Sequence, residues 1–221
     1  MSTPPPDDTR AVFTDIFHRV AWSGGWPETV SGAGSTLEST AGLREALTAL
    51  LADGPLPPNP TVLDAPCGDF NWMREVRGVG HYIGMDIVEP LISDNQHRHG
   101  SETVRFLTGD LTCDPLPAAD VLVCRDCLIH LSDALAVAVL ANFVRSGIPF
   151  LLLSTHGNEA NAEAHGTGGY RPINFALPPF CFPEPLARLP DHLGPHEKYL
   201  ALWSREQVAA ALAALPGADR V

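Results

Sequence analysis

The sequence predicts an α/β fold, built on a mostly parallel, twisted sheet of six or seven strands with helices on both faces. Three observations carry this prediction. Short apolar runs recur along the middle of the chain, acids close the first three of them, and helical apolar spacing follows the fourth. The length of 221 residues and the 45% hydrophobic content fit a single domain with one sizeable core.

The predicted strands occupy residues 60–64, 81–86, 104–111, 119–124 and 149–154. A weak helix is predicted for residues 71–76 and a stronger one for residues 132–145, where apolar side chains recur every three or four positions. Residues 198–203 alternate as a strand does, and Ser204 is the expected N-cap of a following helix. A seventh strand is expected only if residues 171–177 supply it.

The single domain, residues 1–221, divides into four parts. We expect a disordered tail over residues 1–9, a helical lid over residues 10–51, a ligand-binding core over residues 60–156 and a substrate loop region over residues 157–197. Residues 157–197 form a segment too long to serve only as a connection between two elements, because long loops in compact domains usually carry function.

The ends of the first two predicted strands indicate a nucleoside-binding site. Residues 60–64 lead into a turn at Gly68, at the sheet edge where α/β folds bind ligands. Asp86 closes the next strand, 22 residues after Asp64. Its carboxylate can accept two hydrogen bonds from a ribose diol.

The residues of the loop after Asp64 distinguish between a dinucleotide and other nucleoside-containing ligands. A dinucleotide pyrophosphate needs several glycines, so that backbone amides can approach the anion. Residues 67–72 instead contain one glycine, the acid Asp69 and the bulky Phe70, which repel or block an anion. A zwitterionic or cationic ligand is favoured, and S-adenosylmethionine has this character in its aminopropyl group and sulfonium.

With these motifs the chain resembles the class I S-adenosylmethionine-dependent methyltransferases over residues 61–156. Asp64, Gly68 and Asp69 match the family's first motif, and Asp86 matches its ribose acid. Residues 64–72 and 124–130 together look like those of a small bacterial subgroup of undefined substrate.

The resemblance implies a Rossmann-like fold and places the adenine near Asp110 and Leu111, which can accept its amino group and pack on its ring. The sequence departs from the family pattern at Pro66 and Cys67, where a second glycine is common. The expected cofactor-binding residues are Asp64, Cys67, Gly68, Asp69, Phe70, Asp86, Ile87, Asp110, Leu111, Arg125, Trp26 and Ser35.

Two histidines are candidate general bases. Methyl transfer is an in-line displacement, so the protein aligns the acceptor, excludes water and removes one proton. His130 follows the fourth predicted strand and His156 follows the fifth, so both are expected at the ligand-binding edge. Asp126 is the next candidate. Structural roles are the alternatives: a hydrogen bond at the helix after Ser132 for His130, a surface position for His156, and a buried ion pair with Arg125 for Asp126.

Acceptor recognition is expected from Tyr170, Arg171 and Asn174, which combine an aromatic ring, a guanidinium and an amide after a glycine pair. The alternative is a packed loop with Arg171 on the surface. Trp26 and residues 31–35 are expected to form a lid over the cofactor, with a passive linker as the alternative.

Composition limits the partners. A formal net charge of −12 and a pI near 5.0 disfavour nucleic acid, whose phosphates bind Lys and Arg. No apolar stretch approaches the ~20 residues that span a bilayer, and the first residues do not resemble a secretory signal, so we expect a cytoplasmic protein without a membrane partner. Free thiols are expected for the five cysteines, with metal binding by Cys124 and Cys127 as the alternative.

The predicted function is methyl transfer from S-adenosylmethionine to oxygen or nitrogen of a small polar metabolite, a sugar-like or natural-product acceptor in biosynthesis. Two alternatives stay open. One is intramolecular cyclisation or elimination of the same cofactor, and the other is a non-catalytic domain that binds the cofactor or a partner.

Overall fold

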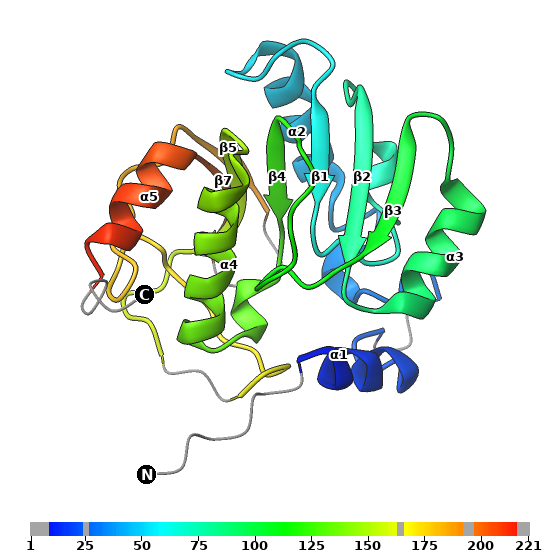
Figure 1. Ribbon diagram of the computed structural model, residues 1–221, viewed down its shortest axis with the longest axis horizontal. Helices are drawn as coiled ribbons and strands as arrows, with labels where there is room; N and C mark the ends of the chain where they lie inside the picture. Colours follow the sequence, from blue (N-terminus) through cyan, green and yellow to red (C-terminus); the bar gives the residue numbers. More distant parts are fainter. Residues whose placement is uncertain (1–8, 24–26, 163–165, 192–196, 216–221) are drawn as a thin grey trace.

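Seven strands form one sheet in the order β3-β2-β1-β4-β5-β7-β6 (Figure 1). The computed structural model describes residues 9–23, 27–162, 166–191 and 197–215. The strands are β1 (Thr61–Asp64), β2 (His81–Asp86), β3 (Val104–Thr108), β4 (Val121–Cys124), β5 (Phe150–His156), β6 (Ala187–Pro190) and β7 (Lys198–Ser204). The first five strands are parallel, and β7 is antiparallel to both β5 and β6.

The strand order places a topological switch point beside β1. This strand pairs with β2 on one side, with Asp64 opposite Gly84, and with β4 on the other, with Leu63 opposite Leu122. The chain builds outwards to β3 and then returns to start β4 on the other side of β1. A crevice forms outside the carboxyl ends of the strands at such a point, and α/β proteins bind their ligands there.

Five α-helices and three short 3-10 helices complete the described chain. They are α1 (Thr9–His18), α2 (Ala41–Asp53), α3 (Glu89–His99), α4 (Asp133–Ser146), α5 (Arg205–Ala213), η1 (Ala33–Ser35), η2 (Met73–Glu75) and η3 (Leu128–His130). Local signals set the ends of the later ones. Ser132 caps α4, Gly147 ends it in the left-handed conformation, and Ser204 and Gln207 form a capping box on α5.

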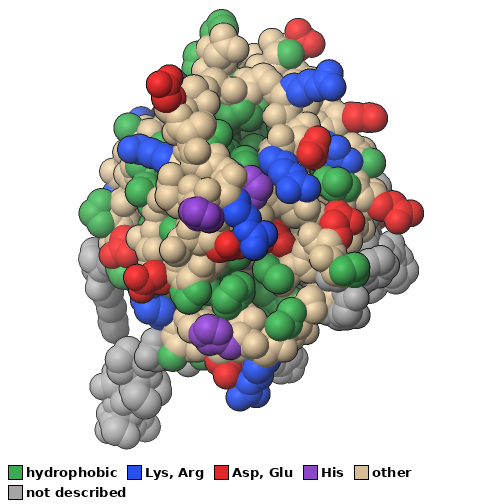
Figure 2. Space-filling model, turned by 90° about the vertical axis from the view of Figure 1, so that its right-hand side faces the viewer, with side chains coloured by type: hydrophobic (Ala, Val, Ile, Leu, Met, Phe, Trp, Pro, Cys, Tyr) green, Lys and Arg blue, Asp and Glu red, His purple; other side chains and the backbone are tan. Residues whose placement is uncertain are grey.

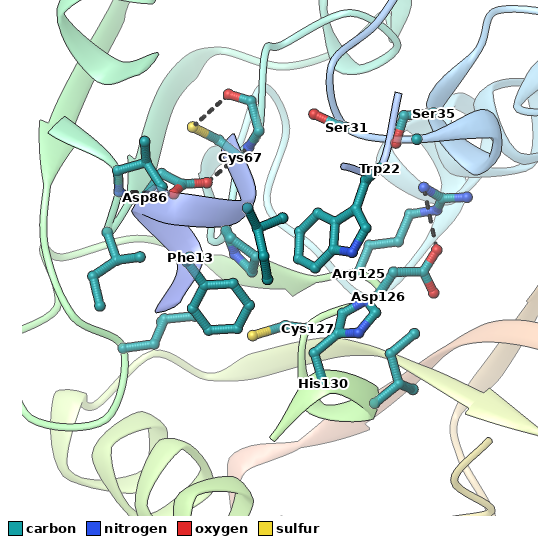
Figure 3. A pocket seen from close by; sticks show the side chains of 18 of the residues that line it. Phe13, Trp22, Ser31, Ser35, Cys67, Asp86, Arg125, Asp126, Cys127 and His130 are labelled. Atoms are coloured by element: carbon teal, nitrogen blue, oxygen red, sulfur yellow. Dashed lines mark hydrogen bonds and ion pairs between the residues drawn. The ribbon is translucent and has the colours of Figure 1, made fainter. Parts of the chain in front are cut away.

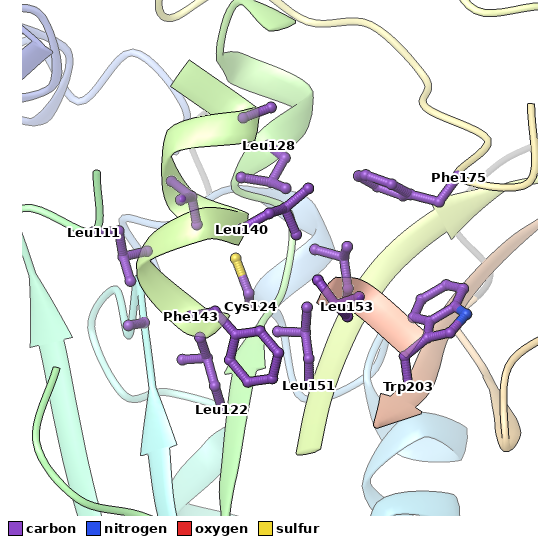
Figure 4. Packing of buried hydrophobic residues seen from close by; sticks show 14 of the residues in the cluster. Leu111, Leu122, Cys124, Leu128, Leu140, Phe143, Leu151, Leu153, Phe175 and Trp203 are labelled. Atoms are coloured by element: carbon purple, nitrogen blue, oxygen red, sulfur yellow. The ribbon is translucent and has the colours of Figure 1, made fainter. Parts of the chain in front are cut away.

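Helices cover both faces of the sheet, as the sequence predicted. Neighbouring residues Val62 and Leu63 of β1 point to opposite faces and are both fully buried. One face packs against α4 and α5 around Phe143, Leu140 and Trp203 (Figure 4). The other packs against α2, α3 and η2, with the buried side chains Leu43, Leu47, Ile92 and Met73. The apolar face of α2 therefore belongs to the core.

The substrate loop region differs from the expectation. Residues 171–177 form no strand, and β6 completes the sheet instead, so the expectation for the seventh strand was wrong. Phe175, Phe180 and Phe182 are buried and pack with Trp203 in the core below α5. Residues 71–76, expected as a weak helix, contain only the single turn η2. The expected tail, residues 1–9, lies outside the described residues except for Thr9, which begins α1.

The helix α1 lies below the carboxyl ends of the parallel strands (Figure 1). Its Arg10 guanidinium donates to Ile87 O, just beyond β2, at 2.8 Å. On the face that carries α3, acidic and basic side chains are interspersed (Figure 2). No helix within the described residues has the length and apolar character to cross a membrane.

Candidate active site

A cavity of about 370 Å³ is lined by α1 on one side and by residues at the carboxyl ends of the strands on the other. Its volume falls within the range of metabolite pockets, roughly 300–1,000 Å³. Figure 3 shows Phe13, Trp22, Cys67, Asp86, Asp126 and His130 around it. The sequence-predicted residues that line it are Asp64, Cys67, Gly68, Asp69, Asp86, Ile87, Asp110, Leu111, Arg125, Ser35, Asp126, His130, His156 and Tyr170.

The turn after β1 is held open by Gly68, whose φ is +54°. This conformation favours glycine, and a Cβ at this position would also displace the Ser31 hydroxyl. The Gly68 amide donates to Asp86 Oδ2 at 3.1 Å, and Asn95 Nδ2 donates to Gly68 O at 2.7 Å. The turn and the predicted ribose acid are thus fixed to each other.

Asp69 joins this turn to Val30 and Ser31, which belong to the segment that covers the cavity. Its carboxylate accepts from the Val30 amide at 2.7 Å and from Ser31 Oγ at 3.1 Å. Ser31 and Ser35 line the cavity from this covering segment. Asp69 therefore holds part of the cover in place, a function that the sequence did not indicate.

Two buried carboxyls, Asp64 and Asp86, face the cavity from neighbouring strand ends. Burial raises the pKa of Asp64 to about 7, although the Tyr82 hydroxyl donates to it at 2.7 Å. Burial also raises the pKa of Asp86, against the effect of the Val88 and Gly68 amides. A cation in the cavity would favour the ionised form of both carboxyls.

Asp110 lies beyond β3 and is oriented by Thr112. The Thr112 amide and hydroxyl donate to Asp110 Oδ1 at 2.8 and 2.6 Å. Among the described residues, none donates to Asp110 Oδ2, which can accept a further donor. Leu111 is buried beside it, and Asn142 Nδ2 donates to its carbonyl at 2.9 Å. This arrangement suits an adenine amino group and ring.

A buried network of four charges underlies the other end of the cavity. Arg125 binds Asp191 through two hydrogen bonds of 2.9 and 2.8 Å, and Lys198 contacts Asp126 at 2.7 Å and Asp191 at 3.1 Å. Two positive and two negative charges balance. Sequence reasoning proposed the Arg125 and Asp126 pair but missed Asp191, the residue after β6, and Lys198, the first residue of β7.

Asp126 is positioned as a fixed anion. Its φ is +50°, a conformation held by its amide, which donates to Ser154 Oγ at 2.9 Å. Burial by itself would raise the pKa of Asp126, but the charges of Arg125 and Lys198 outweigh burial and hold the pKa well below its usual range. A carboxylate of such low proton affinity is a poor base, which argues against the expected catalytic function of Asp126.

His130 has the hydrogen bond that a general base requires. Its Nδ1 lies 2.6 Å from Gly169 O. Because a carbonyl only accepts, Nδ1 carries the proton and Nε2 of the neutral ring keeps its lone pair. Burial lowers the pKa of His130, so the ring is neutral near pH 7. The Gly168 amide also donates to His130 O at 2.8 Å, which fixes η3 to the loop.

His156 is the last residue of β5 and lies buried at the same edge. Its Nδ1 faces the backbone of Ile173, 3.3 Å from the carbonyl oxygen and 3.4 Å from the amide nitrogen. Burial lowers the pKa of His156 as well. Both contacts are long, so His156 is less firmly oriented than His130.

Three predicted site residues lie outside the cavity lining. Arg171 is 3% exposed and donates to Leu131 O at 3.1 Å, to Ala162 O at 2.9 Å and to Asp133, so its guanidinium is bound within the protein. Asn174 bonds within its own loop and to Asn158 O. Phe70 packs against Tyr82 and Phe106 in the core. The expected ligand contacts of these three are therefore corrected to structural ones.

Trp26 lies outside the described residues. Trp22, four positions earlier, lines the cavity and stacks on the His130 ring with centroids 4.7 Å apart. The sequence carried no periodic signal for it. The described part of the chain contains no group of three or more His, Cys, Asp or Glu side chains arranged to hold a metal ion.

No protein-family model matches the sequence, and no curated protein matches it. Solved structures do match. An S-adenosylmethionine-dependent methyltransferase from Leishmania major is 14% identical, with a TM-score of 0.66, over 90% of this chain and 85% of its own. The 1,6-didemethyltoxoflavin N1-methyltransferase of Burkholderia thailandensis, solved with that substrate and S-adenosylhomocysteine, is 19% identical, with a TM-score of 0.60, over 92% of both chains.

The magnesium protoporphyrin IX methyltransferase of Synechocystis PCC 6803, solved with S-adenosylhomocysteine, is 17% identical, with a TM-score of 0.57, over 89% of this chain and 95% of its own. The chain has the fold of the class I S-adenosylmethionine-dependent methyltransferases, as the sequence predicted.

Proposed function

We propose that this protein is a methyltransferase that moves the methyl group of S-adenosylmethionine to oxygen or nitrogen of a small polar metabolite. The observation that carries the proposal is the pairing of Gly68 and Asp86 at the switch point, with His130 on the other side of the same cavity. The structural neighbours solved with S-adenosylhomocysteine support the choice of cofactor.

The cofactor end of the cavity consists of Gly68, Asp86 and Asp110. Asp86 Oδ2 accepts the Gly68 amide and Oδ1 accepts the Val88 amide, and the Ile87 amide also interacts with the carboxylate. Because a carboxylate has about four acceptor sites, capacity remains for a ribose hydroxyl. Asp110 Oδ2 would accept the adenine amino group. When bound there, S-adenosylmethionine supplies an electrophilic methyl group, and the acidic surroundings favour its positive charge.

The acceptor end consists of Asp126, His130 and Tyr170. His130 would take the acceptor proton at Nε2, because its Nδ1 is committed to Gly169 O. Trp22 and α1 cover the cavity and exclude water, which is the function that we assign to the first part of the predicted lid. Alignment of the two reactants in this enclosed space supplies much of the acceleration.

Two measurements test the proposal. Calorimetry with S-adenosylmethionine should show stoichiometric binding that Asp86→Asn weakens. Incubation with a metabolite extract, read by mass spectrometry, should then show one extract component heavier by one methylene group and an equal amount of S-adenosylhomocysteine. Cofactor breakdown without a methylated product would favour cyclisation or elimination. Binding with no reaction would favour a non-catalytic domain, and absence of binding would refute the proposal.

A further inference from the structure

The acceptor end of the cavity is lined by a cluster of rings. Trp22 stacks on His130 at 4.7 Å with an interplanar angle of 25°, Phe13 lies 5.8 Å from Trp22, and Tyr170 lies 6.3 Å from His130. Figure 3 shows Phe13, Trp22 and His130 around one space. The Trp22 indole therefore covers one face of the imidazole at this end of the cavity.

Two of these rings are unusually exposed. Tyr170 is 59% exposed and Trp22 is 37% exposed, although both line the cavity. Large aromatic side chains exposed at the mouth of a pocket mark ligand-binding surfaces, since burying them against a ligand is favourable. The surface that they offer is flat and apolar, which suits an aromatic molecule better than a polyhydroxylated one.

The positively charged side chains at the acceptor end already form ion pairs with aspartates of the protein. Among the described residues that line the cavity, the Lys and Arg side chains are Arg125 and Lys198. Both are bound to Asp126 or Asp191, and Arg171 is bound elsewhere. A carboxylate or phosphate on the acceptor would find no unpaired Lys or Arg among the described lining residues and would lie close to Asp126.

The base also limits the acceptor. His130 is neutral because burial disfavours its charged form, so it accepts a proton only weakly. A phenolic hydroxyl ionises near pH ~10 and is far more acidic than an aliphatic hydroxyl. A buried imidazole is therefore better matched to a hydroxyl on an aromatic ring.

We propose that the methyl acceptor is an uncharged planar aromatic compound with a hydroxyl group on its ring, which binds among Trp22, His130 and Tyr170. This inference rests on the proposed function and names its substrate class. In the reaction, the acceptor oxygen forms a bond to the methyl carbon while the carbon–sulfur bond breaks and its electron pair stays on sulfur. The hydroxyl proton moves to His130 Nε2. The products are an aryl methyl ether and S-adenosylhomocysteine, with the proton later released to water.

A matched set of three probes tests the proposal on protein saturated with S-adenosylhomocysteine: 2-naphthol, its carboxylated analogue 6-hydroxy-2-naphthoate, and methyl α-D-glucopyranoside. Calorimetry should show that 2-naphthol binds at least about tenfold more tightly than the carboxylate, with no measurable binding of the glucoside. Equal or tighter binding of either competitor, or no binding of 2-naphthol, would overturn the inference. Failure to bind S-adenosylhomocysteine would instead overturn the proposed function on which this inference rests.

Two variants sharpen the test. Trp22→Ala should weaken 2-naphthol binding about tenfold and leave S-adenosylhomocysteine affinity within about threefold. Leu186→Ala, which removes an exposed apolar side chain immediately before β6, is the control. An equal loss for both ligands would assign Trp22 to the cofactor and contradict the inference.

Asp126→Asn should reduce the preference for 2-naphthol over the carboxylate, because Lys198 would lose a partner. An unchanged preference would contradict the charge argument.

Discussion

The cofactor end of the cavity, around Gly68 and Asp86, is built from the tips of adjacent strands, whereas the acceptor end, around Asp126 and His130, is assembled from segments far apart in the chain. Gly68 and Asp86 are 18 positions apart and hydrogen-bond directly. At the acceptor end, Arg125 reaches Asp191 across 66 positions and Asp126 reaches Lys198 across 72.

The difference is also one of charge. The cofactor end gathers the buried carboxyls Asp64 and Asp86, which accept hydrogen bonds from a hydroxyl and from backbone amides, and burial raises the pKa of both. The acceptor end contains a balanced network in which Asp126 stays ionised. An excess of carboxyl groups at the cofactor end favours a cationic ligand. The zero net charge of the network at the acceptor end favours an uncharged ligand. Measurements on each end test whether the two ends act separately in this way.

The largest expected effect is on His130. The variant His130→Asn should lower kcat by about 10²–10⁴-fold, because the proton acceptor is lost, while cofactor affinity stays near that of the parent protein. The acid limb of the kcat/KM profile should lie below the ordinary histidine pKa of about 6.5, because burial lowers the pKa of His130.

Steady-state kinetics with an acceptor found by mass spectrometry provide this measurement. The control is His97→Asn, an exposed histidine on α3. A loss below tenfold for His130→Asn would move the base to His156 or leave catalysis to alignment alone.

At the cofactor end, Asp86→Ala should weaken S-adenosylmethionine binding by about 1.5–3 kcal/mol, because hydrogen bonds to a charged acceptor are lost. Calorimetry measures this change, with Glu102→Gln as an exposed acidic control. An unchanged affinity in a folded Asp86→Ala protein would remove Asp86 from the ribose site.

Arg171 is expected to stabilise the fold. The variant Arg171→Ala should lower the free energy of unfolding by about 1–3 kcal/mol, because Leu131 O and Ala162 O lose a buried donor. Urea unfolding measures it, and Arg188→Ala, which breaks an exposed ion pair with Glu184, should change stability by about 0–1 kcal/mol. A stable Arg171→Ala protein with a raised acceptor KM would restore its original assignment to acceptor recognition.

The smallest effect concerns pH. A cationic ligand favours ionised Asp64, so its pKa falls below about 7 on binding and a proton is released. Affinity for S-adenosylmethionine should therefore rise with pH up to about 7 and then level off, with a slope of at most about one logarithmic unit per pH unit. Asp64→Asn should remove this slope, and calorimetry in buffers of different ionisation enthalpy measures the released proton.

The same raised pKa affects the free protein in the opposite direction. Between about pH 4, the ordinary range of an aspartate, and about pH 7, folded Asp64 retains a proton that the unfolded chain has released. The free energy of unfolding should therefore decrease as pH rises across this window. Stability that increases across it, after correction with Asp64→Asn, would contradict the assigned pKa direction.

The sequence by itself determined the elements whose signals are local. Strands β1 to β5 follow from short apolar runs, α4 from its apolar spacing, and α5 from the cap at Ser204. The positions of Gly68 and Asp86 follow as well, because the ends of parallel strands meet at one edge of the sheet. These features depend on residues close in sequence or on neighbouring strands.

Tertiary structure alone decided the charge network and the ring stacking of the acceptor end, although the sequence indicated Asp126, His130 and Tyr170 as site residues. Nothing local distinguishes a guanidinium that faces a ligand from one that satisfies buried carbonyls, so Arg171 was assigned to the wrong environment. The pairing of Asp191 with Arg125, and the stacking of Trp22 on His130, depend on how the β6–β7 hairpin and the segment after α1 pack against the sheet. Such contacts join residues by packing of the whole chain, and no periodicity in the sequence records them.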